Sequence, residues 1–435
     1  MSRTVKRAAH TFDMNYKETI EYLYNSAPMF EKIGADAYKE GLSNTYALDN
    51  HFDNPHRNYK TIHIAGTNGK GSVSHTLASI LQTAGYKVGL YTSPHIIDFS
   101  ERIRVNGLTI SEKYIVDFIE KERSFFEPLH PSFFELTTAL AFKYFADMQV
   151  DIAVIEVGLG GRLDCTNVIN PILSIITNIS FDHTQFLGNT LEKIAGEKAG
   201  IIKKGVPVII GETTDATHQV FETKAKEMQA PIYFAEDDQQ IISSEPTGGG
   251  GRIYHTKDFG TVIGGLGGLC QEKNTNTIFC ALKRLPKLRF GDILAGLKNV
   301  SSLTGLIGRW QVIQENPNII CDTGHNVGGW IYLSEQLNTV KCDRMHIVFG
   351  MVNDKDINSV MELLPKYATY YFTKANTKRA IDEKELIQLA TKHNLKGNTY
   401  PTVSEAFNAA KKTASKKDFI FVGGSSYIVS DFFQI

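Results

Sequence analysis

Residues 61–76, TIHIAGTNGKGSVSHT, decide the fold because they join a short apolar strand to an amphipathic helix through a glycine-rich loop. Ile62 and Ile64 alternate with polar neighbours before the first glycine, which is typical of a strand that enters a turn. After the loop, apolar residues recur at helical spacing until Gly85 stops the helix, and residues 87–93 form a second apolar run. Strand, loop, helix and strand make one βαβ unit, which predicts a parallel sheet.

The loop differs from the common phosphate-binding template, which requires a glycine, four further residues and then Gly-Lys-Ser/Thr. Here two residues separate the first two glycines, and a third glycine lies between Lys70 and Ser72. Glycines let backbone N–H groups approach an anion, and the helix that follows directs its positive end at the same place. A tight turn with a solvated lysine is the alternative, but three glycines with Lys70 and Ser72 favour a phosphate site. The predicted nucleotide loop comprises Gly66, Thr67, Asn68, Gly69, Lys70, Gly71 and Ser72.

The composition is that of an ordinary globular protein, with 42% apolar and 21% charged residues. A length of 435 residues predicts two domains, and a net charge of −1 gives no indication of a nucleic-acid partner. No run of about 18 apolar residues is present, so no membrane partner is expected. The five cysteines are scattered without a CxxC pair, and the first residues lack the apolar stretch of a signal peptide. We therefore expect a cytoplasmic protein without a disulfide framework.

Further apolar runs predict the remaining strands of an α/β fold. Candidate central strands lie at 151–158, 172–180 and 206–212, where Val and Ile are frequent. The glycine-rich texture from about 235 to 270 indicates loops and short antiparallel strands. A second series begins near residue 317, with candidate strands in NIICDTG, MHIVFGMV, ATYYFTKA and DFIFVGG and helices in INSVMELLPKY and DEKELIQLATKH.

These elements predict an α/β protein of two domains. We expect an N-terminal P-loop-type parallel-sheet ATPase domain at 1–303 and a smaller C-terminal Rossmann-like α/β domain at 304–435. The small and polar stretch 301–309, SSLTGLIGR, is the predicted hinge. A cleft between two α/β domains is a common place for a ligand.

A bound triphosphate requires Mg²⁺, which prefers oxygen ligands, so candidate ligands should lie at strand ends beside the loop. Glu156 interrupts an apolar strand just before a glycine turn, and burying a carboxylate there is costly unless it meets a cation. Ser93 ends the next strand and His183 follows another, so both positions are compatible with the same site. The alternatives are a turn-capping Glu156 and a hydrogen-bonded His183, although the adjacent Asp182 adds charge at that corner.

Two other features carry no chemistry on their own. Lys198, in GEKAGIIKKG, has the position of a solvent-facing lysine near a helix end. The glycines that start at Gly158 and Gly265 resemble a dinucleotide-binding GxGxxG motif, but Leu163 and Cys270 occupy the place of the third glycine. A nicotinamide-dependent enzyme is therefore disfavoured.

Taken together, the motifs resemble those of the folylpolyglutamate synthase/dihydrofolate synthase family, which belongs to the Mur ligase superfamily. In chain order they are FEKIG, NPHRNYK, HIAGTNGKGS, YTSPHIIDFSERIRVNG, FFELTTALAF, EVGLGGRLDCTNV, ITNISFDHTQFLG, EKAGIIK, LCQEKNTNT, GLIGRWQ, CDTGHN, FGMVNDKD and GGSSYIV. They span most of the chain, and the set is highly specific although single members are not. Members of that family use a GTNGKGS or GTNGKT loop, which accounts for the unusual spacing. The chain has Ile307 where relatives have proline, and DTGHNV at 322–327 where they have DGAHNP, so local turn geometry is expected to differ.

The resemblance implies a role for each matching residue. Lys70, His183 and Lys198 would be catalytic, with Lys70 holding the β- and γ-phosphates of ATP beside Ser72. Lys198 matches the family's carbamylated lysine, which would place a carboxylate-like group near the metal. Ser93 and Glu156 would bind one Mg²⁺, and His183 a second cation, either Mg²⁺ or a monovalent ion. Nucleotide contacts are implied for Asn274, Arg309, Asp322 and His325, and pterin or folate contacts for Phe134 and Asp164.

The implied activity is ATP-dependent ligation of L-glutamate to dihydropteroate, to (tetrahydro)folate or to both, through an acyl phosphate. The preserved Asp164 favours a pocket that accepts dihydropteroate, and hence a bifunctional enzyme. Enzymes limited to one of these substrates and a non-catalytic nucleotide-binding regulator are the alternatives. A cell-wall-precursor ligase of the same superfamily is disfavoured by the TSPH and RLDCTN motifs. The expected partners are these small molecules, and the chain is expected to be a monomer.

Overall fold

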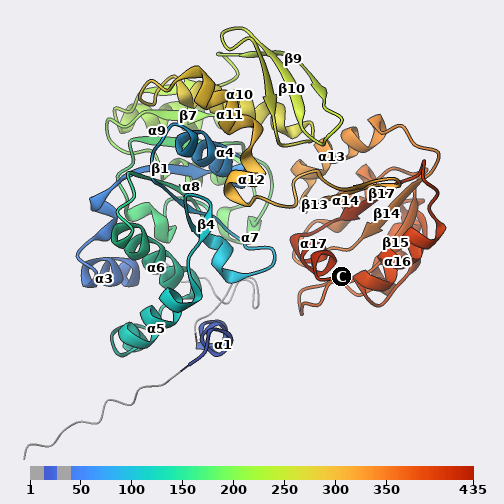
Figure 1. Ribbon diagram of the computed structural model, residues 1–435, viewed down its shortest axis with the longest axis horizontal. Helices are drawn as coiled ribbons and strands as arrows, with labels where there is room; N and C mark the ends of the chain where they lie inside the picture. Colours follow the sequence, from blue (N-terminus) through green and yellow to red (C-terminus); the bar gives the residue numbers. More distant parts are fainter. Residues whose placement is uncertain (1–13, 27–40) are drawn as a thin grey trace, which may run out of the picture.

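Figure 1 shows the computed structural model of the chain, which describes residues 14–26 and 41–435. Two sheets of mainly parallel strands lie in separate lobes, and a small antiparallel sheet projects beside the first. The predicted α/β fold with two main domains is thus confirmed, whereas the boundary between 303 and 304 stays a prediction. The FEKIG motif and residues 1–13 lie outside the described part. Among the described residues, no helix is long and apolar enough to cross a membrane.

The first sheet is built around the glycine-loop unit. Its strand order is β4-β3-β2-β5-β1-β6-β7-β8, and neighbouring strands from β2 to β8 run parallel. β5 therefore lies between β1 and β2, the two strands that the loop helix connects. The predicted strands of this series are confirmed. The strands are β1 (Lys60–Ala65), β2 (Val88–Tyr91), β3 (Ile103–Val105), β4 (Leu108–Thr109), β5 (Ile152–Glu156), β6 (Leu173–Ile176), β7 (Val208–Ile210) and β8 (Ile232–Phe234).

Helices cover both faces of this sheet, which explains its continuous apolar strands. In β5, Ile152 and Val154 join a core formed with α4, α10 and α11, whereas Ala153 and Ile155 join a core on the other face with α5 and α6. The helices are α1 (Tyr16–Ser26), α3 (Ser43–His51), α4 (Lys70–Thr83), α5 (Glu112–Phe126), α6 (Phe133–Asp147), α7 (Thr184–Leu187), α8 (Leu191–Ala199), α9 (Asp215–Glu227), α10 (Cys270–Leu282) and α11 (Phe290–Lys298). The small antiparallel sheet, predicted from the glycine-rich texture, comprises β9 (Ile241–Pro246), β10 (Arg252–Thr256) and β11 (Thr261–Gly264).

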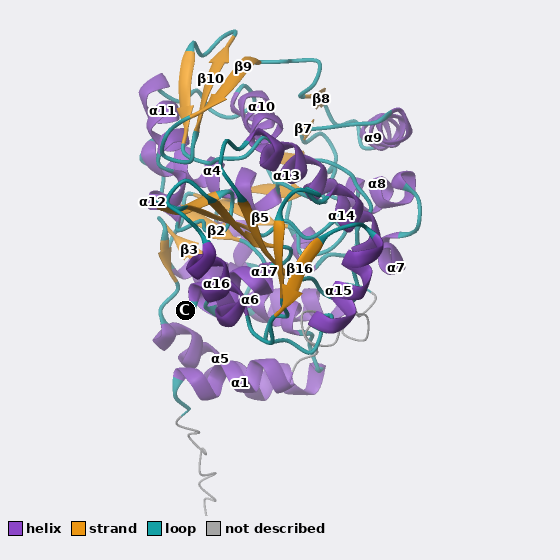
Figure 2. Cartoon of the chain, turned by 90° about the vertical axis from the view of Figure 1, so that its right-hand side faces the viewer, coloured by secondary structure: helices purple, strands orange, loops and turns teal. Residues whose placement is uncertain are grey.

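The second main sheet has the order β12-β13-β17-β14-β15-β16, and only its edge strand β12 runs antiparallel. Figure 2 views the chain from this side, with the edge strand β16 between α16 on one side and α14 and α15 on the other. The strands are β12 (Gln311–Glu315), β13 (Asn318–Asp322), β14 (Met345–Phe349), β15 (Thr369–Phe372), β16 (Lys396–Thr399) and β17 (Phe419–Gly423). The helices are α13 (Val327–Thr339), α14 (Ile357–Leu363), α15 (Glu383–Lys392), α16 (Val403–Thr413) and α17 (Ser426–Phe433).

The predicted hinge at 301–309 begins within a helix, α12 (Val300–Thr304). Val300 and Thr304 are buried, and the Thr304 hydroxyl lies 2.8 Å from Nδ1 of His75 in α4, so this turn packs on the first lobe. Gly305 ends the helix in the left-handed region, with a φ of 69°. The connection between the sheets is therefore shorter than the sequence predicted, because a buried helical turn occupies its first part.

Candidate active site

The glycine loop connects the carboxyl end of β1 to the start of α4 in a backbone shape that only glycine tolerates. Gly66 and Gly69 have φ angles of 145° and 83°. A Cβ at Gly66 would lie 1.9 Å from the Thr177 hydroxyl oxygen, and one at Gly69 would lie 2.3 Å from the Asn274 side-chain oxygen. Gly69 caps α4 without any side chain. The N–H groups of the first turn of α4 are therefore left open to a ligand.

Lys70 lies at the centre of this loop. Its ammonium donates to the carbonyl oxygens of Gly66 and Thr67 at 3.1 and 3.2 Å. Burial lowers the pKa of Lys70, whereas the nearby carboxylates of Glu156 and Asp182 act in the opposite direction. The lysine thus places a cation where the open helix end also favours an anion.

The two first metal candidates meet at the ends of neighbouring strands. Glu156 ends β5 and is 3% exposed, and its carboxylate accepts a hydrogen bond from the backbone N–H of Ser93 at 3.2 Å. Burial raises the pKa of Glu156, against the lowering effect of Lys70. Among the described residues, no three His, Cys, Asp or Glu side chains lie close enough to hold a metal. A cation here would need the Ser93 hydroxyl and phosphate or water oxygens, which is the coordination that Mg²⁺ prefers.

His183 precedes α7 with a φ of 50°, and burial lowers its pKa to about 3. Its imidazole is therefore neutral at pH 7, the form that can bind a metal. His183 lines the cavity between the lobes, whereas Glu156 lies at the end of β5 and is not among the residues that line it. Their metal roles stay predictions.

Lys198 is buried at the end of α8, so the solvent-facing position that the residue pattern indicates is wrong. It is 4% exposed, and its amine donates to the Gly66 carbonyl oxygen at 2.9 Å. The turn after β5 packs against the end of α8, since a Cβ at Gly161 would lie 3.0 Å from the Lys198 carbonyl oxygen. Burial and the charge of Lys70 lower the pKa of Lys198 to about 7.

The two residues assigned to the pterin, Phe134 and Asp164, line a cavity that Lys70 of the loop also lines. Phe134 stacks on Tyr91 with ring centroids 5.8 Å apart, and a Cβ at Gly158 would lie 2.4 Å from its ring. Asp164 is 5% exposed, and its carboxylate already accepts hydrogen bonds from Leu159 and Thr166. Asp164 therefore also shapes the turn in which it lies.

The residues assigned to nucleotide come together from three elements around the loop. Asn274 of α10 donates to Gln271, which in turn donates to the Ser72 hydroxyl at 3.2 Å. The Arg309 guanidinium lies 3.4 Å from the position of a Cβ on Gly71. Asp322 ends β13 and accepts the N–H groups of Trp310 and Gly324 at 2.7 and 2.8 Å. His325 follows in the same loop and lines the cavity.

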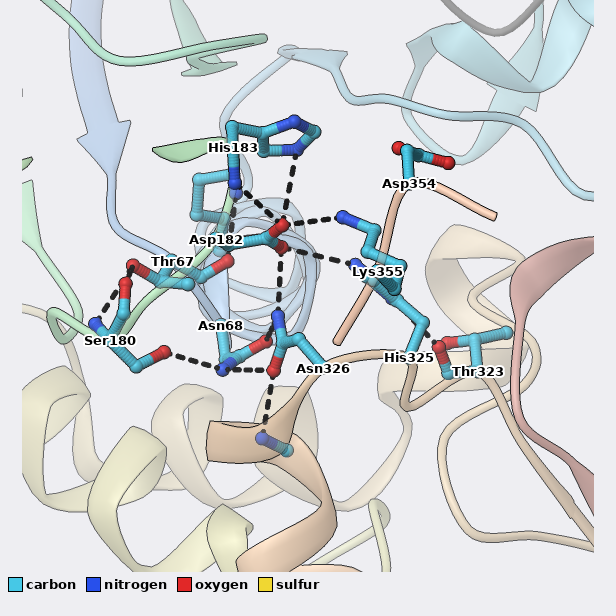
Figure 3. Close-up of polar contacts among 12 residues, drawn as sticks. Thr67, Asn68, Ser180, Asp182, His183, Thr323, His325, Asn326, Asp354 and Lys355 are labelled. Carbon is cyan, nitrogen blue, oxygen red and sulfur yellow. Dashed lines mark hydrogen bonds and ion pairs between the residues drawn. The ribbon is translucent and has the colours of Figure 1, made fainter. Parts of the chain in front are cut away.

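Three further residues, Asp182, Asn326 and Lys355, complete the contact between the lobes (Figure 3), and of these the residue pattern indicated only Asp182, as charge beside His183. Asp182 accepts from Lys355 at 2.5 Å and from the Asn326 amide at 2.9 Å, and His325 lies 3.5 Å away. Lys355 lies in FGMVNDKD and Asn326 in CDTGHN, so both fall in quoted motifs. Burial would raise the pKa of Asp182, but the hydrogen bond from His325 and the charge of Lys355 hold it well below the usual range.

One cavity of about 250 Å³ joins these groups. Its walls include Lys70, Ser93, Phe134, Asp164, His183 and Lys198 from the first lobe and His325 and Lys355 from the second. The predicted site residues that line it are Gly66, Thr67, Lys70, Ser93, Phe134, Asp164, His183, Lys198 and His325, whereas Asn68, Gly69, Gly71, Ser72, Glu156, Asn274, Arg309 and Asp322 are not among its lining residues. A concave site that combines an aromatic side chain with a few convergent polar and charged groups is the usual form of a ligand-binding site.

Each of the two lobes matches a known protein domain. Residues 64–257 match the model of the Mur ligase middle domain, and residues 308–426 match that of the Mur ligase glutamate ligase domain. A dihydrofolate synthase/folylpolyglutamate synthase of Bacillus subtilis is 34% identical over 410 residues, which cover 90% of this chain and 94% of that protein. Such a protein from Escherichia coli is 31% identical and covers 86% of this chain and 85% of its own length.

Solved structures show the same similarity over nearly the whole chain. Escherichia coli FolC in complex with DHPP and ADP has a TM-score of 0.83 and 28% identity, with 97% of each chain covered. A bifunctional folylpolyglutamate synthase/dihydrofolate synthase of Yersinia pestis, complexed with AMPPNP and Mn ion, has a TM-score of 0.81 and 27% identity. That match covers 97% of this chain and 98% of the other.

Proposed function

The chain belongs to the folylpolyglutamate synthase/dihydrofolate synthase family of Mur ligases and is an ATP-dependent glutamate ligase of folates, and we propose that the cavity between its lobes carries the reaction. The observation that carries the proposal is the composition of that cavity. One wall holds the nucleotide loop with Lys70, another holds Phe134, and the second lobe contributes His325 and Lys355. An aromatic substrate, its carboxylate and a nucleotide phosphate can therefore meet there.

The reaction follows from the low reactivity of a carboxylate towards an amine at neutral pH. An oxygen of the pteroate or folate carboxylate attacks the γ-phosphorus of ATP, the bond to the bridging oxygen breaks, and ADP and an acyl phosphate form. The α-amino group of L-glutamate then attacks the acyl carbon, phosphate leaves with its oxygen, and the amine loses a proton to solvent. Lys70 and the open N–H groups of α4 would stabilise the charge on the phosphoryl oxygens in the first step.

Relatives with bound nucleotide support a metal in this site, because one of them is complexed with AMPPNP and Mn ion. We assign a Mg²⁺ to Ser93 and Glu156, and a second cation to His183. A bound Mg²⁺ would draw negative charge from the phosphoryl group while keeping part of its water shell. The neutral His183 and the buried Glu156 have the chemistry that such a cation requires.

We further propose that Lys198 is carbamylated. A carbamate forms when a neutral amine attacks carbon dioxide, and burial lowers the pKa of Lys198 to about 7, so much of the amine is neutral at that pH. Its side chain reaches the Gly66 carbonyl oxygen below the nucleotide loop. A carbamate there would add a negative group beside Lys70.

The finer assignments concern substrate range and state. We propose that both dihydropteroate and (tetrahydro)folate are accepted, since relatives named for both activities cover nearly the whole chain. Phe134 would stack on the pterin, and the Asp164 carboxylate would face its amino group. A cytoplasmic monomer remains part of the proposal.

An ADP-release assay with purified protein tests the function. Dihydropteroate and tetrahydrofolate are each supplied with ATP, Mg²⁺ and L-glutamate, and the product mass is measured in parallel. We expect ADP release that requires both the pterin substrate and glutamate, with a product heavier by one glutamyl residue. ADP release that ignores glutamate, or ATP binding without turnover, would instead support a regulator.

A further inference from the structure

The first turn of α13 sits directly against the nucleotide loop of the other lobe (Figure 3). Asn326 caps this helix, and its side-chain oxygen accepts the Gly329 N–H at 2.9 Å. The residue is 4% exposed, so its amide has no access to bulk water. Because the cap fixes which end of the amide is the oxygen, the nitrogen must point away from the helix and towards the first lobe.

Every polar atom of the Asn326 amide then finds a partner across the interface. Its nitrogen donates to the Asp182 carboxylate at 2.9 Å and to the Asn68 side-chain oxygen at 3.0 Å. The Asn68 nitrogen returns a hydrogen bond to the Asn326 oxygen at 3.0 Å and reaches the Ser180 hydroxyl at 3.3 Å. Two amides that exchange hydrogen bonds in this way admit one relative orientation.

Asn68 is in turn fixed to the first sheet. Its backbone N–H donates to the Asn178 side chain at 2.9 Å, and its carbonyl oxygen accepts from the Thr177 hydroxyl at 2.5 Å. The nucleotide loop and the strand-end segment after β6 therefore form one surface, against which Asn326 is seated.

Gly328 allows this close approach. A Cβ at that position would lie 2.6 Å from the Ser180 hydroxyl oxygen and 3.1 Å from the Asn68 side-chain nitrogen. Contacts under about 3 Å force atoms apart, so the helix end has no room for a methyl group. The steric fit at Gly328 and the hydrogen bonds between the Asn326 and Asn68 amides are independent observations. Both indicate one close contact between the lobes, which we call the joint.

We propose that Asn326, seated on Asn68 and supported by Gly328, is a positioning residue that sets the second lobe on the nucleotide loop. It would thereby place His325, its neighbour in sequence, and Lys355, its neighbour on Asp182, over the site of phosphoryl transfer. Because Asn68 belongs to the loop, the second lobe takes its position from the same loop that binds phosphate. The inference rests on the proposed function, because the alignment matters only if ligation occurs between the lobes.

The first test replaces the hydrogen-bond donor of Asn326 with a carboxylate. Asn326→Asp keeps the helix cap but leaves the Asp182 carboxylate and the Asn68 oxygen facing a group without a proton. We expect kcat to fall roughly 30- to 100-fold, as for misaligned reacting groups, with the KM for the folate substrate within about twofold of wild type. Asp182→Asn in the same chain returns a donor to this contact, and Lys355 keeps an oxygen acceptor. The double variant should therefore be at least fivefold faster than Asn326→Asp alone.

Gly328→Ala tests the same joint by steric means, with Gly291→Ala as the matched control. Gly291 also lies in the first turn of a helix, but a Cβ there would meet nothing within 4 Å. We expect about a tenfold fall in kcat for Gly328→Ala and none for the control, with both unfolding cooperatively near the wild-type temperature.

The possible outcomes distinguish a failure of the positioning role from a failure of the proposed function. Wild-type kcat in both joint variants, a parallel rise in folate KM, or a double variant no faster than Asn326→Asp would overturn the positioning role. Wild-type protein without any ADP release that depends on both a pterin substrate and glutamate would overturn the proposed function itself. Slow joint variants, an active control and a faster double variant would establish the joint.

Discussion

Two helices begin at the carboxyl ends of parallel strands where the two lobes meet, and their first residues differ. α4 follows β1 and is capped by Gly69, which offers no side chain. α13 follows β13 and is capped by Asn326, whose oxygen accepts the Gly329 N–H at 2.9 Å. Both arise from the same strand–loop–helix arrangement, yet one helix end is open and the other is closed.

The difference shows how one arrangement serves two purposes. An open helix end leaves N–H groups and the positive end of the helix dipole for an anion. A capped end has already satisfied one of these groups, and its cap can turn its remaining polar atoms to a neighbouring surface. The first lobe therefore has the means to bind phosphate, whereas the second has the means to dock on the loop that does so.

Loss of the cation at the open end should have the largest effect. Lys70→Ala removes the ammonium from the phosphate position, and we expect kcat/KM to fall on the order of 10³-fold, because an interaction with the transferring group is lost. The measurement is ADP release with pterin substrate and glutamate, with circular dichroism to show an intact fold. Lys60→Ala, an exposed lysine at the start of β1, is the control. Normal glutamate incorporation by Lys70→Ala would refute the assignment of the loop.

Lys198 contacts the nucleotide loop that precedes the open end of α4, because its amine donates a hydrogen bond to the Gly66 carbonyl oxygen. We expect Lys198→Ala to lose activity by roughly several-hundred-fold, and added formate or acetate to restore part of it by replacing the carbamate. Full activity of this variant without any additive would show that Lys198 has no catalytic part.

The same lysine predicts a pH dependence. Since its pKa is lowered to about 7, the neutral amine that reacts with carbon dioxide becomes the main form as the pH rises through that value. Protein stripped of carbon dioxide and then supplied with the same concentration of dissolved carbon dioxide at each pH should regain activity faster at pH 8 than at pH 6, an effect roughly tenfold in rate. Equal recovery rates at both pH values would contradict the carbamate.

Substitution of each cap residue tests the difference between the two helix ends. Gly69→Ala forces a residue with a φ of 83° to accept a Cβ that meets Asn274, so the dissociation constant of ATP should rise roughly 30-fold. Asn326→Gly removes the cap and the joint but leaves the open end intact, so ATP should bind within about threefold of wild type while kcat falls. Isothermal titration calorimetry measures both constants. Equal losses of ATP affinity in the two variants would show that both helix ends contribute to ATP binding, and not the start of α4 alone.

The smallest effect is expected away from both helix ends. Phe134→Ala removes the ring that faces the pterin side of the cavity, and the KM of the folate substrate should rise about tenfold. The KM for ATP should stay unchanged, because Phe134 lies on the other wall. Steady-state kinetics with each substrate varied in turn decides this, and a matching rise for ATP would mean general damage.

Much of the fold was predictable because its signals are local. The apolar runs at β1, β2 and β5 to β7 and in the second lobe lie at the predicted strands, since period and composition report burial directly. The insertion of β5 between β1 and β2 was not predictable in this way, because strand order depends on contacts between distant segments. The buried turn of α12 inside the predicted hinge also depended on distant packing.

The residues of the candidate site also differ in whether a local sequence signal indicates them. The glycine loop and Glu156 stood out from the residues alone, because glycines and a carboxylate in an apolar run are locally unusual. Lys198 did not, since only the packing of α8 under the loop shows its burial, and family resemblance alone indicated a role. Asn326 and Lys355 carry no local signal at all, because their function appears only where two lobes meet at Asp182.

Isotope transfer tests the central claim most directly, namely that ATP activates the carboxylate as an acyl phosphate before the amine of glutamate attacks it. A folate substrate whose reacting carboxylate carries the heavy oxygen isotope is converted with ATP and L-glutamate, and the released phosphate is analysed by mass spectrometry. The account predicts one heavy oxygen in each phosphate released, since the acyl phosphate breaks at the carbon. Phosphate without the heavy isotope, formed at the rate of product, would contradict it.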